Sequence, residues 1–273
     1  MDITIEAVLP EECISAIISS TSPPDACRCS LLSRIFRSAA GSDLVWERFL
    51  PPDYQQIISQ SESSVSSLLN VLPKKDIYFH LCRNPILIGN GNTSFAIDKW
   101  SGKKCYMLGA RELCVIWGHD ARYWKWVSSA ESPVFAQSRF SEVAHLLHVC
   151  WLLIGRRIET NILSPNTRYG AYFVYTLVGD HFNGFDRPVK VSIKFENENE
   201  GNATNDAYLL PDTPGGQNGQ VPRRREDMWL EVEIGDFFNG QVDRVVDMQL
   251  GETRVLNGKS GLVVHGIELR PKE

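Results

Sequence analysis

Apolar residues in the first fifty positions recur at the spacing of amphipathic helices. Ile14, Ile17 and Ile18 lie three and four residues apart, which places them on one face of a helix. Proline at position 10 suits a helix start, because its missing N–H breaks no hydrogen bond in the first turn. The segment predicts three short helices, which begin near Pro10, at Asp25, and at Ser42 or Asp43.

From about residue 100 onward the dominant period is two, which is typical of β-strands. Residues 189–195 and 228–234 alternate apolar and polar side chains, so each should bury one face. Residues 169–178 and 262–269 are apolar on both faces, as in central strands of packed sheets. Residues 140–158 fit a helix in their first part and a strand in their second, where a strand is favoured. With Gly, Asn and Pro clusters between them, these strands indicate a β-sandwich.

The segment between these two parts has neither pattern. Pro51-Pro52 ends the helical part, and six serines fall between residues 59 and 67. This composition predicts a Ser-rich connector, although apolar residues near helical spacing leave open that it is partly ordered. The chain is therefore divided into residues 1–53, 54–94 and 95–273.

Three helices in about 45 residues can bury little surface, since domains of this size seldom form a substantial core alone. The segment nevertheless contains Trp46, two phenylalanines and many Ile and Leu residues. Part of this apolar surface is expected to face a partner protein. The alternative is that the helices pack on the rest of the same chain.

Composition and charge exclude several classes of protein. The 273 residues are 43% hydrophobic and carry a net charge of -5, which excludes a disordered chain and the basic excess of a nucleic-acid-binding protein. No apolar run is long enough to span a membrane, and the N-terminus lacks the pattern of a secretory signal. The seven cysteines are scattered, so they are expected to be reduced thiols in the cytoplasm or nucleus.

The helical segment resembles the F-box of plant F-box proteins. The resemblance covers residues 5–53 and rests on four motifs, Leu9-Pro10-Glu11-Glu12, Thr21-Ser22-Pro23-Pro24-Asp25-Ala26-Cys27-Arg28, Phe36-Arg37-Ser38-Ala39-Ala40-Gly41-Ser42-Asp43, and Val45-Trp46 with Phe49-Leu50-Pro51. It implies docking on the Skp-type adaptor of a cullin-RING ubiquitin ligase. The residues at the apolar positions of the motif, which are core or adaptor contacts, are Leu9, Pro10, Ile14, Ile17, Ile18, Leu31, Phe36, Val45, Trp46 and Phe49.

Residues 113–126 hold four large aromatic side chains within ten positions. Aromatic faces can stack on the C–H faces of sugar rings, so a glycan-binding platform is one interpretation. The other is that the segment belongs to the core. If residues 122–126 form a strand, Trp124 points away from Tyr123 and Lys125, and one of the two tryptophans, 124 or 126, is buried.

Residues 95–273 resemble the phloem-protein-2 lectin domain, the tobacco-agglutinin type. The motifs that carry the resemblance are Trp100-Ser101-Gly102-Lys103-Lys104-Cys105-Tyr106, Trp117-Gly118, Tyr123-Trp124-Lys125-Trp126, Arg139-Phe140-Ser141-Glu142-Val143-Ala144, Leu163-Ser164-Pro165-Asn166-Thr167, Trp229-Leu230-Glu231-Val232-Glu233 and Gly261 to Pro271. The family implies a β-sandwich lectin that binds glycans containing N-acetylglucosamine or related glycans. Trp117, Tyr123 and Trp124 are the candidate glycan-binding residues. The chain departs from the family at Asp227-Met228-Trp229, where relatives carry Asp-Gly-Trp.

No motif for catalysis, metal binding or a cofactor accompanies these segments. The sequence therefore predicts a multidomain, non-catalytic protein, with a small all-α F-box of three helices followed by an all-β lectin-like β-sandwich. The implied function is substrate recognition for an SCF-type (Skp-cullin-F-box) ubiquitin ligase, with a glycoprotein or protein as target. The alternative is a nucleocytoplasmic lectin that acts independently of ubiquitination. Neither interpretation involves a membrane or a nucleic acid.

Overall fold

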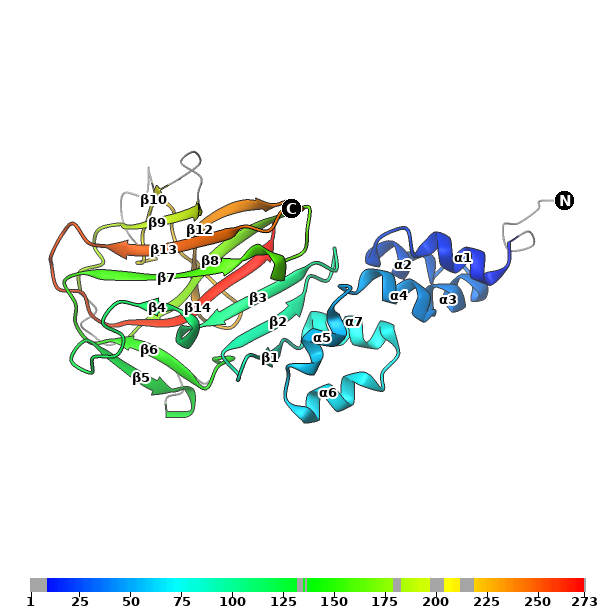
Figure 1. The fold of residues 1–273 in the computed structure, drawn as a ribbon, viewed down its shortest axis with the longest axis horizontal. Coiled ribbons are helices and arrows are strands. Elements are labelled where there is room, and N and C mark those ends of the chain that lie inside the picture. Colours follow the sequence, from blue (N-terminus) through cyan, green and yellow to red (C-terminus); the bar gives the residue numbers. More distant parts are fainter. Residues whose placement is uncertain are drawn as a thin grey trace. The chain divides into compact units, whose positions relative to one another are not determined.

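A computed structural model of the chain describes residues 9–131, 135, 137–178, 183–196, 204–211 and 219–272. Its internal contacts divide the chain into two compact units. The helical unit comprises residues 1–89 and 95–105, and the β unit comprises residues 90–94 and 106–273 (Figure 1). Helices followed by antiparallel sheets are the predicted fold class, which is confirmed. None of the described helices is long and apolar enough to cross a membrane.

The F-box-like segment contains four helices, where the sequence predicted three. They are α1 (Glu11–Ile18), α2 (Pro23–Cys29), α3 (Arg34–Gly41) and α4 (Asp43–Phe49). The predicted second helix is interrupted because the Ser33 side chain accepts a hydrogen bond from the backbone N–H of Phe36 at 3.3 Å and so caps α3. Ser22, and not Asp25, is the N-cap of α2, and Ser42 caps α4 as expected.

The core of the helical unit is built around Trp46, which is fully buried. Its indole N–H donates to the carbonyl oxygen of Ala40 at 2.7 Å, so this buried donor is satisfied. Tyr78 packs against the indole with ring centroids 5.1 Å apart. Because Tyr78 belongs to residues 54–94, the predicted connector contributes to this core.

That connector contains three helices and a short strand. They are α5 (Tyr54–Ser59), α6 (Ser63–Asn70), α7 (Lys74–Arg83) and β1 (Ile86–Ile88). Each helix buries apolar side chains, with Ile58, Leu69 and Leu81 no more than 1% exposed. Residues 54–89 therefore belong to the folded helical unit, and this part of the connector is more ordered than its serine content indicates.

The remaining strands form two antiparallel sheets. The bounds are β2 (Thr93–Ile97), β3 (Lys104–Gly109), β4 (Cys114–Val115), β5 (Trp124–Ser128), β6 (Glu142–Leu146), β7 (Leu152–Glu159), β8 (Thr167–Leu177), β9 (Val189–Phe195), β10 (Thr204–Ala207), β11 (Arg223–Arg224), β12 (Leu230–Asn239), β13 (Val245–Glu252) and β14 (Leu262–Pro271). One sheet has the order β1-β2-β3-β14-β8-β12-β11, with β6 paired to β14 and β5 paired to β6. The other has the order β10-β9-β13-β7-β4.

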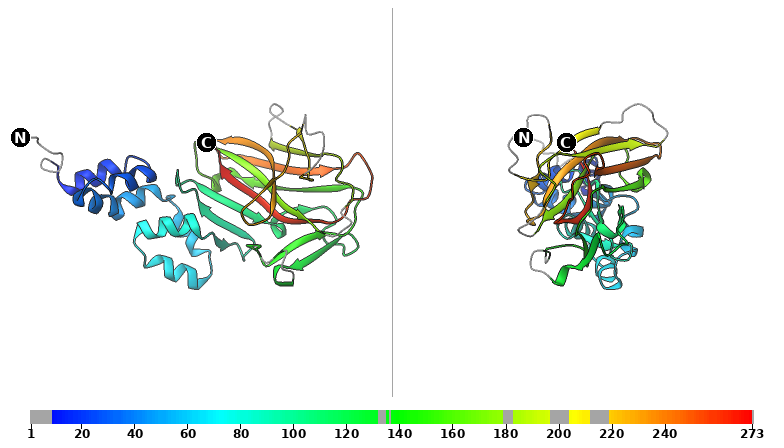
Figure 2. Two further views of the ribbon diagram at one scale, coloured as in Figure 1. Left: turned by 180° about the vertical axis from the view of Figure 1, so that it is seen from behind. Right: turned by 90° about the vertical axis from the view of Figure 1, so that its left-hand side faces the viewer.

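The two sheets pack face to face, and their layers can be followed in Figures 1 and 2. Phe195 of β9 meets Phe237 of β12 edge to face, with ring centroids 5.9 Å apart. Leu230, Val232 and Ile234 are buried along β12, as the alternating pattern predicts. Residues 140–158 hold two strands, so the helical alternative for their first part is wrong and the strand expected in their second part is confirmed.

Candidate functional site

The structure separates the apolar positions of the F-box-like segment into core and surface. Four side chains that are at most 2% exposed form the core: Ile14, Ile18, Val45 and Trp46. Three are half-buried: Leu9, Phe36 and Phe49. Pro10 is exposed, and so are the side chains of Ile17 and Leu31, at 57% and 77%. Only the exposed and half-buried residues are available to a partner in this structure.

Three further large apolar side chains in the same segment are exposed: Leu32, Ile35 and Leu44. With Ile17 and Leu31 they form the set that we call the exposed apolar set. Ile17, Ile35 and Leu44 lie on α1, α3 and α4, whereas Leu31 and Leu32 lie in the turn between α2 and α3. The sequence does not indicate which of these side chains face outward. Exposed side chains of this kind, gathered in one small unit, are typical of a surface that binds another protein.

In the β unit, two indoles hold the loop that carries Trp117. The indole N–H of Trp124 donates to the carbonyl of Ile116 at 3.1 Å, and that of Trp126 donates to the carbonyl of Gly118 at 2.8 Å. The two tryptophans lie two residues apart on β5, so both point to the same side of the strand. These hydrogen bonds fix the carbonyls on either side of Trp117.

Trp117 itself is 46% exposed and has a backbone φ of 63°, in the left-handed region that a bulky residue seldom adopts. Tyr123 lies beside it, with ring centroids 6.0 Å apart. Trp124, by contrast, is only 2% exposed. The three predicted glycan-binding residues are therefore close together, with Trp117 and Tyr123 open to a ligand and Trp124 beneath them as support for the loop.

A carboxylate lies next to this aromatic pair. Hydrogen bonds from Arg122 lower the pKa of Asp120 to about 2, so the carboxylate is ionised at neutral pH. The N–H of Asp120 donates to the carbonyl of Trp117 at 2.9 Å, which ties the residue to the same loop. A ring face beside an ionised acceptor could serve the apolar face and the hydroxyl groups of a sugar.

A groove with a volume of about 800 Å³ adjoins this loop. Leu113, Val115 and the two indoles of β5 give it apolar walls. Arg111 lines it as well, with its guanidinium 3.7 Å from the centre of the Trp126 ring. Among the described residues, no group of His, Cys, Asp or Glu side chains is arranged to hold a metal ion in this groove or elsewhere.

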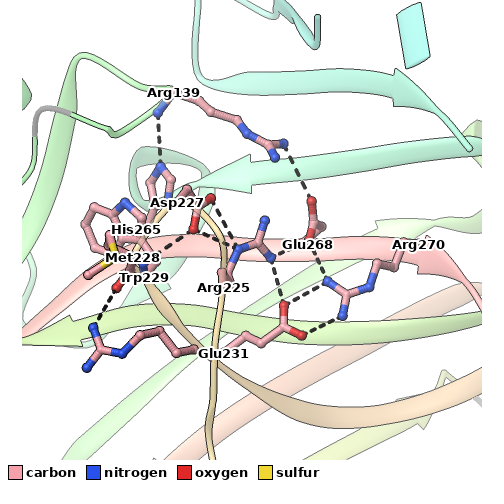
Figure 3. Close-up of polar contacts among 10 residues, drawn as sticks. Arg139, Arg225, Asp227, Met228, Trp229, Glu231, His265, Glu268 and Arg270 are labelled. Atoms are coloured by element: carbon pink, nitrogen blue, oxygen red, sulfur yellow. Dashed lines mark hydrogen bonds and ion pairs between the residues drawn. The ribbon is translucent and has the colours of Figure 1, made fainter. Parts of the chain in front are cut away.

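A cluster of charges around two buried glutamates, shown in Figure 3, was not predicted from the sequence. We call Arg139, Arg225, Glu231, Glu268 and Arg270 the charge cluster. Arg225 donates to Glu231 at 2.8 Å and to Glu268 at 2.6 Å, and Arg270 donates to the same two carboxylates at 2.6 Å and 2.8 Å. Both glutamates are less than 10% exposed. The alternating pattern predicts that Glu231 lies on the polar face of its strand, but in the structure this side chain is buried.

The charges in the cluster compensate each other. Burial alone would raise the pKa of Glu268, but the neighbouring guanidinium groups, chiefly that of Arg225, outweigh it and lower the pKa to about 2. Burial lowers the pKa of the adjacent His265 to about 3, so its ring is neutral and accepts a hydrogen bond from the backbone N–H of Arg139 at 3.2 Å. With its carboxylates already paired, the cluster stabilises the fold and offers no free group for chemistry.

Comparison with known proteins identifies both units. The family model for phloem protein 2 matches residues 103–271, and the F-box-like model matches residues 7–51. The chain belongs to the phloem protein 2 family of F-box proteins. Within that family, it is similar to the Arabidopsis thaliana F-box protein At2g02240, at 40% identity over 97% of this chain and 79% of the relative. It is also similar to the putative F-box protein PP2-B12 of the same plant, at 42% identity over 97% of both chains.

Solved structures resemble this phloem protein 2 chain only weakly. The CBM22-1 xylan-binding domain of Paenibacillus barcinonensis Xyn10C gives a TM-score of 0.33 at 12% identity, over 60% of this chain and 87% of that domain. A likeness this weak carries no information about the ligand. The similar F-box proteins show the family of the chain. What the chain binds has to be inferred from its own surface residues.

Proposed function

We propose that this F-box protein is a substrate-recognition subunit of an SCF-type ubiquitin ligase. The helical unit would dock on a Skp-type adaptor, and the β unit would bind a glycoprotein or protein target. The chain would bring the target to the cullin-RING ligase, whose other subunits perform the transfer of ubiquitin. The cytoplasm and the nucleus are the compartments in which we expect this role.

The observation that carries the docking proposal is the exposed apolar set beside a complete core. Trp46, Val45, Ile14 and Ile18 already fill the interior of the helical segment. The exposed set therefore adds nothing to that interior, whereas burial against a partner would contribute about 25 cal/mol for each Å² of apolar surface. This supports a protein partner for the helical unit.

Adaptor capture tests the proposal. A double variant, Ile17→Asp with Leu31→Asp, places charges where the interface would be dry, and we expect it to lose capture by an immobilised plant Skp-type adaptor. Leu68→Asp with Val71→Asp is a matched control, because these side chains of the same unit are 53% and 78% exposed and lie outside the F-box-like segment. Equal capture of both variants would exclude the exposed apolar set as the docking surface.

For the target, we propose that Trp117 and Tyr123 contact a glycan containing N-acetylglucosamine and that Trp124 positions them. A glycan array on the full chain should show binding that Trp117→Ala removes while the melting temperature stays close to that of the parent protein. Trp100→Ala is the control, since Trp100 is 55% exposed and belongs to the helical unit. An array with no bound sugar would leave protein recognition as the role of the β unit.

The second candidate is a lectin that acts independently of ubiquitination. The exposed Trp117, held by two indole hydrogen bonds, favours it as much as it favours glycan recognition within a ligase. The adaptor experiment distinguishes the two: a chain that binds glycans but fails to bind any Skp-type adaptor is a lectin alone.

A further inference from the structure

The groove beside the Trp117 loop lies between the edges of the two sheets. β4 ends the order of the five-stranded sheet, and β5 pairs only with β6 within the described part of the chain. Both edge strands line the groove, β4 through Cys114 and Val115 and β5 through Trp124, Lys125 and Trp126. An edge strand presents backbone groups that can pair with another chain.

The hydrogen bonds between β5 and β6 show which backbone N–H and C=O groups of β5 are not paired with β6. The N–H of Leu147 donates to Tyr123 and the N–H of Ser129 donates to Ser141, both at 2.8 Å. The register between these contacts is regular, so odd-numbered residues of β5 bond to β6. The N–H and C=O groups of Trp126 and Ser128 consequently point toward the outer edge, with the two-residue spacing that an added strand requires.

The charged side chains that line the groove are basic, and the nearest acidic residues, Asp120 and Glu142, are each paired with an arginine. Arg111 and Lys125 line the groove, and none of its lining residues in the described part of the chain is acidic. Lys125 is exposed, and within the described residues no carboxylate lies within ion-pair distance of its ammonium group. Arg111 has a partner in Glu142 at 2.9 Å, but both side chains are 39% exposed, so the guanidinium remains open to a further anion.

We propose that the outer edge of β5 and the adjoining groove bind an extended acidic segment of a target protein by strand addition. The backbone of the segment pairs with Trp126 and Ser128. Neighbouring side chains of an added strand point to opposite faces, so acidic residues meet Lys125 on one face while apolar ones pack on the indoles of the other. The inference rests on the proposed role of the β unit in target recognition and is independent of adaptor docking.

Fluorescence anisotropy with the full chain tests this assignment. The probe is a labelled peptide of alternating glutamate and valine, and its counterpart carries glutamine in place of glutamate. We expect binding of the acidic peptide that weakens with added salt, with the glutamine peptide at least about tenfold weaker. Methylation of alternate backbone nitrogens of the acidic peptide should abolish binding, because strand addition needs those N–H groups.

Two charge reversals locate the site. Lys125→Glu should weaken binding of the acidic peptide at least about tenfold, whereas Lys194→Glu, at an exposed position of β9, should leave it within about twofold. Wild-type affinity in Lys125→Glu, or equal affinity for the methylated peptide, would overturn the proposal. So would displacement of the peptide by an N-acetylglucosamine oligomer whose own binding ignores Lys125, since the groove would then be a neutral sugar site.

Adaptor capture, measured on the same preparations, separates this inference from the function on which it rests. Lys125→Glu should retain adaptor capture while losing the peptide, and the Ile17→Asp, Leu31→Asp variant should show the reverse. A wild-type chain that captures the adaptor but binds no acidic peptide leaves the ligase role intact and refutes the β5 site.

Discussion

The two units of this chain place polar and apolar side chains in opposite ways. The F-box-like segment of the helical unit exposes five large apolar residues although its core is complete. The β unit buries two glutamates, on β12 and β14 of one sheet, among three arginines. The first arrangement adds nothing to folding and is suited to binding, whereas the second stabilises the fold only as long as every charge keeps its partner.

This difference predicts where substitutions will affect stability and where they will affect binding. Removal of one member of a buried ion-pair network leaves other charges uncompensated in a poorly solvated site. Replacement of an exposed apolar residue costs little in the free chain, because the side chain was already in water.

Glu268→Ala should destabilise the β unit by about 3–5 kcal/mol, since Arg225 and Arg270 lose a carboxylate that each contacts within 3 Å. The free energy of unfolding in urea, followed by the circular dichroism of the sheets, measures the loss. Glu226→Ala is the matched control, because Glu226 is exposed and its change should stay within about 0.5 kcal/mol. Similar values for the two variants would show that the cluster contributes little.

Acid should destabilise the β unit from about pH 6.5 downward. The pKa of His265 is about 3 in the folded chain against 6.5 ordinarily, so between these values the unfolded chain binds a proton that the folded chain does not. Stability is therefore complete above pH 6.5 and falls as pH decreases, by about 2 kcal/mol at pH 5. Below about pH 4.5 Glu268 adds to the loss, because its pKa is also lowered, to about 2.

Urea unfolding between pH 7 and pH 5 measures this dependence. His265→Gln keeps an acceptor for the N–H of Arg139 but cannot titrate, so the decrease in stability over this range should be smaller than in the parent chain. His119→Gln, at an exposed histidine, should leave the decrease unchanged. An identical decrease in all three proteins would exclude His265 as its source.

The smallest effect on folding is expected for Ile17→Asp with Leu31→Asp, whose unfolding free energy should stay within about 1 kcal/mol of the parent value. The same variant is expected to lose adaptor capture. In the helical unit the substitutions should therefore affect binding and not stability, whereas Glu268→Ala in the β unit should affect stability. Thermal unfolding of the variant and its Leu68→Asp, Val71→Asp control measures the difference. A large loss of stability would show that Ile17 and Leu31 support the core and are not free for a partner.

Local patterns were enough to predict much of the fold. The period of two predicted β9 and β12, apolar runs predicted β8 and β14, and serine at position 42 predicted the start of α4, because each of these signals lies within a few residues. The division of the predicted second helix was missed, since the four-residue spacing of Leu31 with Ile35 and Leu32 with Phe36 continues across the cap at Ser33.

Features that depend on distant strands could not be predicted. Glu231 on β12 and Glu268 on β14 come together because both strands pair with β8, at Val174 and Tyr172. Nothing in the sequence around either glutamate indicates that register. In the same way, the sequence predicts an aromatic cluster at residues 117–126. It does not indicate that Trp117 is exposed while Trp124 is buried and donates a hydrogen bond to the carbonyl of Ile116.

Oxidative footprinting of side chains can show whether the exposed apolar set binds the adaptor, because it measures the exposure of individual residues in the full chain with and without a Skp-type adaptor. We predict that Ile17, Leu31, Leu32 and Leu44 lose reactivity when the adaptor is added, while Leu68 and Val71 keep theirs. Unchanged reactivity of the exposed apolar set in a chain that binds the adaptor would contradict the account.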